Sequence, residues 1–262
     1  MAATATAQVP KLYNHLSNET HTIHSRLLNE DLSFYIHAPK LDSSANNAPL
    51  PVMYLLDGDN HFHIVSAYIE YLRHWNVLPP IIVVGIISNN RVRELTPVKS
   101  LKNFDGEVDS AFKVSGGNYE FLQFIEQELV PYIETRHKTS PYKIFAGHSF
   151  GGLAVLNCLL TRPNMFDAYI AISPSLWFGN KHVLRLARQE AKKLKFKNKT
   201  LFCSVGNEDG TFKPDINQLH DIFQQNATSL TELFKFYPGE DHMTEPIPAY
   251  YDALRFIFKN WK

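Results

Sequence analysis

Two nearly continuous apolar runs constrain the fold of this chain more than any other feature of its sequence. They are Pro51–Leu56 (PVMYLL) and Pro80–Ile87 (PIIVVGII). A strand with apolar residues on both faces must be covered on both faces, which is typical of a parallel sheet between two layers of helices. The two runs therefore predict the centre of an α/β sheet.

Strand and helix patterns alternate along the rest of the chain. Helical spacing of apolar residues marks 66–75 and 118–137, with Pro131 as a point where the second helix can bend. Further strands are expected at 142–146, 168–172, 200–205 and 230–237, and further helices at 150–161, 181–194, 214–226 and 247–261. This alternation predicts a doubly wound, mostly parallel sheet. Two earlier strands, 21–28 and 32–38, indicate an antiparallel entry to it.

The domain organisation is expected to be simple. Residues 1–20 are polar and irregular, which predicts a loose N-terminal arm. No point within 21–262 combines a composition shift with a Pro-, Gly- or Ser-rich linker. Because 44% of the 262 residues are hydrophobic, the chain can bury a sizeable core, and one α/β domain over 21–262 is the prediction.

Charge and cysteine content narrow the classes of partner. Lys+Arg and Asp+Glu both number 26, and this balance argues against nucleic acid and anionic membrane surfaces as partners. Cys158 and Cys203 lie in apolar stretches and are read as buried thiols rather than a disulfide. The first ten residues do not resemble a signal peptide, so a cytoplasmic location is expected, or a periplasmic or secreted one if a signal peptide has been removed.

A serine between glycines carries the first chemical signal. The segment Phe145–Val155 (FAGHSFGGLAV) contains Gly147-His148-Ser149-Phe150-Gly151, a match to G-x-S-x-G. Five residues with three fixed occur often by chance, and a polar helix cap next to a glycine would look the same. Here the motif follows an apolar strand and opens an apolar helix, which is the setting of a nucleophile elbow. Ser149 is therefore the expected nucleophile.

A serine nucleophile needs a base and an acid, both later in the chain for the hydrolase order Ser–acid–His. Of the three later histidines, His182 and His220 fall on predicted helices. His242 instead follows the strand 230–237, at the carboxyl edge of the sheet. The strand before it ends in Gly206-Asn207-Glu208-Asp209-Gly210, where either carboxylate could orient the histidine. These residues alone do not choose between Glu208 and Asp209.

Two backbone N–H groups are expected to bind the oxyanion. One belongs to Phe150, directly after the nucleophile. The other is expected in the turn after strand 51–56 (YLLDGDNHF), where Gly58 permits a tight bend and Asp59 offers its N–H. The pair His61 and His63 has no cysteine or carboxylate cluster to complete a metal site. The expectation is a cofactor-free site with no metal.

The substrate pocket is expected between two further stretches. The long polar segment 88–117 contains Arg91 and Arg93, and the loop after strand 168–172 contains Trp177 and Phe178. Loops of this length are usually functional. For Phe178 and Arg93, ordinary packing at the rim is as good an interpretation as substrate contact. Trp177 and Arg91 are the predicted substrate-binding residues. No amphipathic lid like that of a lipase is visible.

These residues together resemble the esterase D-type branch of the α/β hydrolases, and most closely its siderophore trilactone esterase-like group. The resemblance starts near residue 20 and rests on segments that include NRVRELTP (90–97), AISPSLWF (171–178), SVGNED (204–209) and GEDHMTEPIPAYYDALRFIF (239–258). It implies an α/β-hydrolase fold with Ser149 and His242 as nucleophile and base. It also favours Asp209 as the acid, with Glu208 as the fallback, and supports Asp59 as an oxyanion donor.

The resulting hypothesis is a serine carboxylic-ester hydrolase that acts through an acyl-enzyme on short-chain, aryl or lactone esters. An acyltransferase or thioesterase would use the same residues. A binding protein on a hydrolase fold is the alternative from another class, but it would usually have lost the serine, the histidine or an elbow glycine. The expected partner is a small-molecule ester, and the sequence makes no prediction of oligomeric state.

Overall fold

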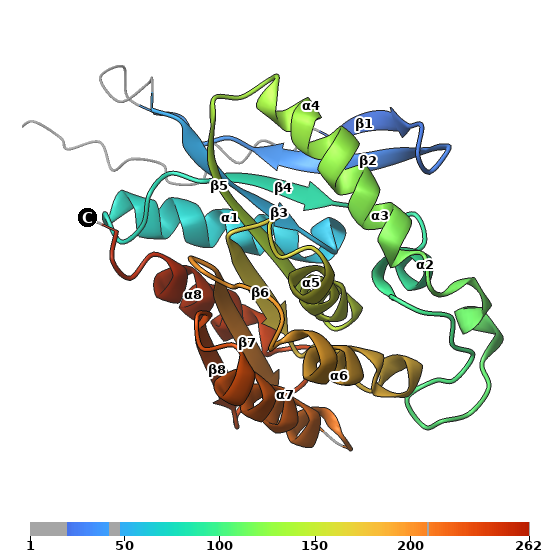
Figure 1. The fold of residues 1–262 in the computed structure, drawn as a ribbon. Coiled ribbons are helices and arrows are strands. Elements are labelled where there is room, and N and C mark those ends of the chain that lie inside the picture. Colours follow the sequence, from blue (N-terminus) through green and yellow to red (C-terminus); the bar gives the residue numbers. More distant parts are fainter. Residues whose placement is uncertain (1–19, 42–47, 209, 262) are drawn as a thin grey trace, which may run out of the picture.

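The structure is a computed structural model that describes residues 20–41, 48–208 and 210–261. Eight strands form one sheet in the order β1-β2-β4-β3-β5-β6-β7-β8 (Figure 1). Their bounds are β1 Thr20–Ser25, β2 Glu30–His37, β3 Leu50–Leu55, β4 Ile82–Ile86, β5 Thr139–His148, β6 Ala168–Ile172, β7 Thr200–Gly206 and β8 Thr231–Tyr237. Strands β3 to β8 pair in parallel, while β2 pairs antiparallel with both β1 and β4. The doubly wound sheet with antiparallel N-terminal strands is thus confirmed.

Two layers of helices cover the sheet. Helices α1 (Gly58–His74) and α8 (Pro246–Ile257) pack on one face, and their apolar side chains share a core with residues of β3, β4 and β6. Helices α3 (Asn118–Phe124), α5 (Phe150–Thr161), α6 (Phe178–Glu190) and α7 (Phe212–Asn226) contribute to the core on the other face. Every residue of β4 and β6 is buried, as expected for strands covered on both sides.

Three segments differ from expectation. Helix α1 begins at Gly58 rather than Ser66, because the turn after β3 passes directly into the helix. The predicted helix 118–137 is interrupted by a π-helical turn, Ile125–Leu129, before α4 (Val130–Glu134), with Pro131 in the first turn of α4. Segment 88–117 is not entirely loop: it contains α2 (Arg91–Leu95) and a 3-10 turn, Ser110–Val114. The side chains of Asn90 and Asp109 cap the starts of these two short helices. The polar composition of the segment favoured a loop and did not reveal them.

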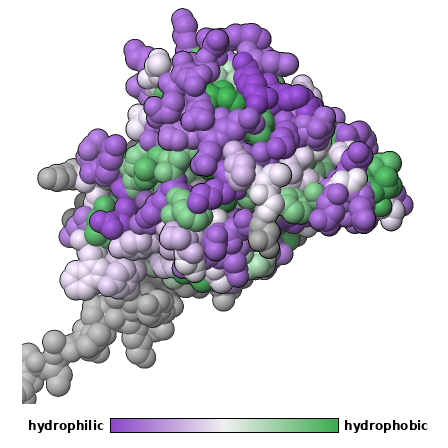
Figure 2. All heavy atoms as spheres, turned by 90° about the horizontal axis from the view of Figure 1, so that it is seen from below, coloured by the Kyte–Doolittle hydropathy of each residue, from purple (hydrophilic) through white to green (hydrophobic). Residues whose placement is uncertain are grey.

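Other features follow the sequence closely. Both cysteines are buried free thiols. The face of the molecule shown in Figure 2 is mostly hydrophilic, with small hydrophobic areas scattered over it, in keeping with the balanced charge. Within the described residues, no helix has the length and apolar character needed to cross a membrane. The arm predicted over 1–20 lies outside the described residues except for Thr20, which already belongs to β1.

Candidate active site

The nucleophile elbow, Gly147–Gly151, joins β5 to α5. Ser149 has φ 60° and ψ −116°, a conformation that costs energy for any residue with a side chain. The turn is so tight that a Cβ built on Gly147 would lie 2.5 Å from the carbonyl carbon of Gly151. Glycine is therefore required at position 147 by contact between two backbone segments. The Ser149 N–H donates to the carbonyl of Ile172 at 2.9 Å, which ties the elbow to β6.

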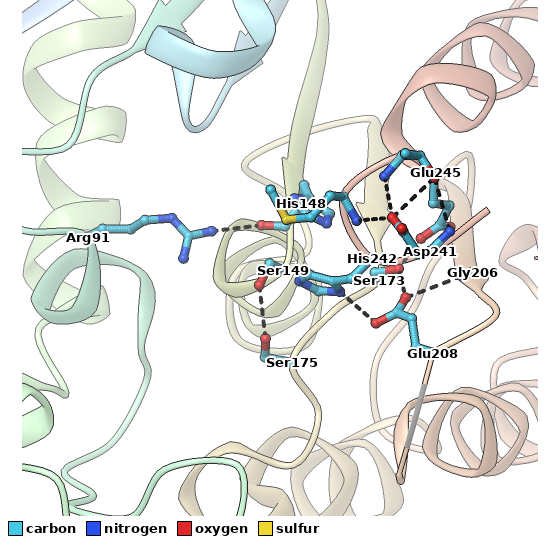
Figure 3. Close-up of polar contacts among 12 residues, drawn as sticks. Arg91, His148, Ser149, Ser173, Ser175, Gly206, Glu208, Asp241, His242 and Glu245 are labelled. Atoms are coloured by element: carbon cyan, nitrogen blue, oxygen red, sulfur yellow. Dashed lines mark hydrogen bonds and ion pairs between the residues drawn. The ribbon is translucent and has the colours of Figure 1, made fainter.

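His242 lies beside this elbow with its ring held by a carboxylate (Figure 3). The distance from His242 Nδ1 to Glu208 Oε2 is 2.6 Å, and the Glu208 side chain is almost fully buried. The N–H of Gly206 also donates to Glu208 Oε1, at 3.3 Å. This arrangement leaves the other ring nitrogen of His242 available as a base.

Glu208 thus occupies the orienting position that the family resemblance assigned first to Asp209. Asp209 lies outside the described residues, so the structure gives no position for its carboxylate. The turn after β7 explains how Glu208 comes to face His242. The N–H of Asn207 donates to the carbonyl of Glu240 at 2.6 Å, which binds this turn to the one that carries His242. The next side chain along, that of Glu208, then points toward the imidazole.

The Ser149 hydroxyl is hydrogen-bonded to Ser175 Oγ at 3.3 Å rather than to His242. Ser149 and His242 nevertheless line the same two cavities. Without bound substrate, catalytic hydrogen bonds are often long or poorly aligned, and they tighten when the substrate is in place. The arrangement is compatible with proton transfer from Ser149 to His242 after a small rotation of the serine side chain.

His148 packs directly against the base, a contact that sequence reasoning missed. Its ring centroid is 4.6 Å from that of His242 and 5.6 Å from that of His61. Burial is the main cause that lowers the pKa of His148 to about 2, and the neighbouring His242, His61 and Arg91 lower it further. His148 is therefore neutral in the working range of pH. A neutral neighbour packs against His242 without adding a charge.

The two expected oxyanion donors lie at the starts of helices. Phe150 begins α5 and Asp59 lies in the first turn of α1, where backbone N–H groups have no partner within the helix. Asp57, in the left-handed conformation with φ 52°, accepts from the N–H groups of Asn60 and His61. Among the backbone hydrogen bonds of the described chain, none uses the N–H of Phe150 or Asp59. Both N–H groups are thus available to a ligand.

Arg91 supports the elbow from the other side. Its guanidinium forms two hydrogen bonds with the Asp57 carboxylate, at 2.7 and 2.9 Å, and a third with the carbonyl of His148 at 3.1 Å. This predicted substrate-binding residue therefore already has partners within the chain. Arg93, the other candidate, pairs with Glu30 and Glu94 and packs at the surface.

A cavity of about 620 Å³ opens on one side of Ser149; we call it the aromatic cavity. Trp177 lies in its wall, and its ring centroid is 5.7 Å from those of both Phe104 and Phe150. Phe178 is fully buried and does not line the cavity, so packing is the better interpretation for it. Five aromatic side chains take part in the lining: Phe104, Phe112, Phe150, Trp177 and Phe212.

A second cavity, of about 500 Å³, is also lined by Ser149 and His242; we call it the polar cavity. Arg91, Asn60 and His61 contribute polar groups to it, while Met243 and Ile247 form an apolar rim. The nucleophile and base therefore lie where two cavities meet. Within the described residues, no group of three or more His, Cys, Asp or Glu side chains is arranged to hold a metal ion.

Comparison with known proteins places the chain in a family. Residues 25–249 match a family model described as "Putative esterase". The chain belongs to this Esterase family. It is 29% identical over 251 residues to the ferri-bacillibactin esterase BesA of Bacillus subtilis, covering 87% of this chain and 86% of BesA. It is 28% identical over 254 residues to the siderophore triacetylfusarinine C esterase of Aspergillus fumigatus, covering 84% and 85%.

A solved structure gives the same answer for the fold. An IroE-like serine hydrolase from Shewanella oneidensis is 32% identical and superposes with a TM-score of 0.88 over 93% of this chain and 81% of that chain. With the family match and the named esterases, this likeness supports the resemblance to trilactone-type esterases drawn from the sequence. The chain is a carboxylic ester hydrolase with an α/β-hydrolase fold.

Proposed function

We propose that this esterase works through an acyl-enzyme on Ser149, with His242 as base and Glu208 as the acid. The observation that carries the proposal is the 2.6 Å contact between His242 Nδ1 and Glu208 Oε2 beside a serine at a strained elbow. A serine hydroxyl is a weak nucleophile, so it needs an oriented base to remove its proton. Nucleophile, base and acid come from three separate strand ends, as hydrolysis on this fold requires.

The reaction then proceeds in two stages. His242 Nε2 takes the proton of Ser149 Oγ as the oxygen attacks the ester carbonyl, and Glu208 stabilises the resulting imidazolium without becoming protonated. The N–H groups of Phe150 and Asp59 stabilise the negative charge that develops on the carbonyl oxygen. The imidazolium gives its proton to the departing alcohol. Water, activated by the same histidine, then releases the acid from Ser149.

For the substrate, we propose an ester with a sizeable group on each side of the scissile bond, one of them aromatic. The aromatic cavity suits an aryl group, because its rings offer flat apolar surfaces. The polar cavity, which shares Ser149 and His242 with the aromatic cavity, leaves room for a second arm of the same molecule. The relatives are named as esterases of bacillibactin and triacetylfusarinine C, and an aryl or lactone ester of siderophore type fits the same description. Short aryl esters would occupy only part of the site.

Replacement of the nucleophile tests the mechanism. Ser149→Ala should lower kcat by about 10⁴–10⁶-fold, as in other serine triads. Ser175→Ala is the matched control, because it removes the neighbouring hydroxyl at 3.3 Å and should leave most of the activity. A fluorophosphonate probe should add its mass to the peptide that contains Ser149. Turnover that persists in Ser149→Ala would exclude an acyl-enzyme on this residue.

A substrate series tests the pocket. If a deep acyl tunnel were present, kcat/KM would rise about fourfold for each added methylene, since each buried CH₂ contributes about 0.8 kcal/mol. We expect instead that p-nitrophenyl esters beyond about eight carbons are poor substrates, and that aryl lactones are better ones. Trp177→Ala should reduce the preference for aryl over alkyl acids severalfold. Trp75→Ala, a change at a tryptophan that is 63% exposed at the end of α1, is the control and should not.

A further inference from the structure

A second glutamate lies behind the proposed acid (Figure 3). Glu245, at the start of α8, is fully buried. The hydroxyl of Ser173, which follows β6, is hydrogen-bonded to Oε1 of Glu208 and also to Oε2 of Glu245. One hydroxyl therefore bridges two carboxyl groups, and one of those carboxyl groups holds the histidine of the active site.

Counting protons shows that the two carboxyl groups cannot both be ionised in this arrangement. The Ser173 hydroxyl has a single hydrogen to donate, while an ionised carboxylate can only accept. With two carboxylates, one of the contacts would be an oxygen against an oxygen with no hydrogen between them. Either Glu208 or Glu245 must then carry the extra proton.

The surroundings identify Glu245 as the protonated member. Glu208 accepts hydrogen bonds from His242 Nδ1 at Oε2 and from the Gly206 N–H at Oε1, so both of its oxygens serve as acceptors, as those of a carboxylate do. Glu245 has no ion pair with any cationic side chain that the structure describes, and its Oε1 has no hydrogen-bond partner there. The side chain of Glu245 makes no cap bond to the first N–H groups of α8.

The titratable groups that surround Glu245 also favour its protonated form. From the other elements these are Glu208, His242, Cys203 and Tyr237, and from α8 itself Tyr250. Burial is the main cause that raises the pKa of Glu245 to about 7; the charge of Glu208 raises it further, while the Ser173 and Ser204 hydroxyls and His242 lower it. A neutral carboxylic acid can donate a hydrogen bond, which an ionised one cannot.

We propose that Glu245 and Ser173 are positioning residues of the esterase, an inference that rests on the function proposed above. The O–H of Glu245 donates to Ser173 Oγ, and the O–H of Ser173 donates to Glu208 Oε1. This chain fixes the Glu208 carboxylate so that its Oε2 faces His242 Nδ1. The neutral state of Glu245 also keeps a second negative charge away from the base.

The backbone of Ser173 supports this role. Its φ is +39°, in the left-handed region that costs energy for a residue with a side chain, and its N–H donates to the carbonyl of Ser204 at 2.9 Å. The chain after β6 is thus held in a strained turn that directs a hydroxyl between two carboxyl groups. A glycine would take the same backbone conformation without strain, but it would have no hydroxyl to offer.

Paired substitutions separate the hydroxyl from the backbone. Ser173→Gly and Ser173→Ala both remove the hydroxyl, while only the glycine suits the positive φ. We expect both to lower kcat by about tenfold to a hundredfold with little change in KM, the size of effect that follows a small misplacement of catalytic groups. If Ser173→Gly kept wild-type kcat and only Ser173→Ala lost activity, the turn alone would matter and the proposal would be overturned.

Glu245 is tested by rescue and by pH. Glu245→Gln keeps a donor for Ser173, so its kcat should stay within about threefold of the wild-type value. Glu245→Ala has no donor, so its kcat should be lowered as much as that of Ser173→Gly. In the wild type, ionisation of Glu245 as pH rises removes the proton that it donates to Ser173, so kcat should decline on the alkaline side. In Glu245→Gln the amide still donates at every pH, so this alkaline limb should move to higher pH. Glu232→Gln, at a carboxyl in β8 whose pKa is also raised by burial, is the control and should leave the limb in place.

The outcomes separate this inference from the proposed function. Thermal unfolding of each variant identifies any loss of activity that comes from loss of the fold. If Ser149→Ala is inactive while the Ser173 and Glu245 variants match the wild type in kcat and in pH profile, only the positioning role is overturned. If Ser149→Ala is active, the proposed mechanism itself is wrong, whatever the other variants do.

Discussion

The nucleophile elbow and the turn after β7, which we call the acid turn, lie at the same edge of the sheet but are specified in different ways. In the elbow, backbone meets backbone: Gly147 and Gly151 approach so closely that side chains are excluded at position 147. In the acid turn, Glu208 and Asp209 are adjacent residues of the same chemical type, and the direction of a side chain decides which one serves the histidine.

This difference shows which parts of a site a sequence can specify by local rules. The elbow is fixed by sterics within five consecutive residues, so its pattern is visible in the sequence. The acid turn takes its geometry from a distant segment, because the Asn207 N–H binds the carbonyl of Glu240 and Ser173 binds Glu208. Those partners lie more than thirty residues away in either direction, so no local sequence pattern predicts them.

Within this comparison, the largest expected effect tests the acid turn directly. Glu208→Gln should lower kcat by about 10²–10⁴-fold, because an amide no longer stabilises the imidazolium and permits the wrong tautomer. Asp209→Asn is the matched control and should change kcat by less than about threefold. Steady-state kinetics on one aryl ester decide between them.

The reverse ranking would restore Asp209, which the family resemblance favoured, as the orienting acid. Two small effects would instead indicate a Ser–His dyad in which neither carboxylate is needed. Either result would also remove the basis for the bridge through Ser173, because that bridge acts on Glu208.

The division between what was and was not predictable follows from the same comparison. The positions of Ser149, His242 and the two helix-start N–H groups could be predicted because each follows a recognisable strand end, while their roles stay predictions. The pairing of Arg91 with Asp57 could not, since it joins α2 to the turn after β3 across thirty-four residues. Ser173 and Glu245 gave no signal at all, because a serine and a glutamate near strand or helix ends are ordinary surface residues in most sequences.

The second prediction tests the steric specification of the elbow. Gly147→Ala should destabilise the fold by about 1–3 kcal/mol, since the new Cβ would lie 2.5 Å from the Gly151 carbonyl carbon. For a chain of this size, that corresponds to a fall in Tm of about 2–4 °C per kcal/mol. Gly239→Ala is the control, because a Cβ there meets nothing within 4 Å. Equal Tm values for the two variants would contradict the steric argument.

The smallest expected effect concerns His148, the buried residue between Gly147 and Ser149 in the elbow. The pKa of His148 is lowered from the ordinary 6.5 to about 2. Below about pH 6.5, His148 therefore binds a proton in the unfolded chain but not in the folded chain. The unfolded state then gains protons as pH falls, and the free energy of unfolding drops by up to about 1.4 kcal/mol per pH unit from this one group. The stability from His148 is complete above about pH 6.5 and declines as the solution becomes more acidic.

Replacement of His148 should therefore flatten the dependence of stability on pH. Between pH 6.5 and pH 5, we expect the free energy of unfolding of His148→Gln to fall by about 1.6 kcal/mol less than that of the wild type, whatever its value at neutral pH. His74→Gln, a change at an exposed histidine in the last turn of α1, should leave the slope unchanged. Denaturant unfolding at a series of pH values measures both slopes. If the free energy of unfolding depended on pH in the same way in His148→Gln and the wild type, His148 would bind a proton in the folded state. His242 would then have a charged neighbour at acidic pH, not a neutral one.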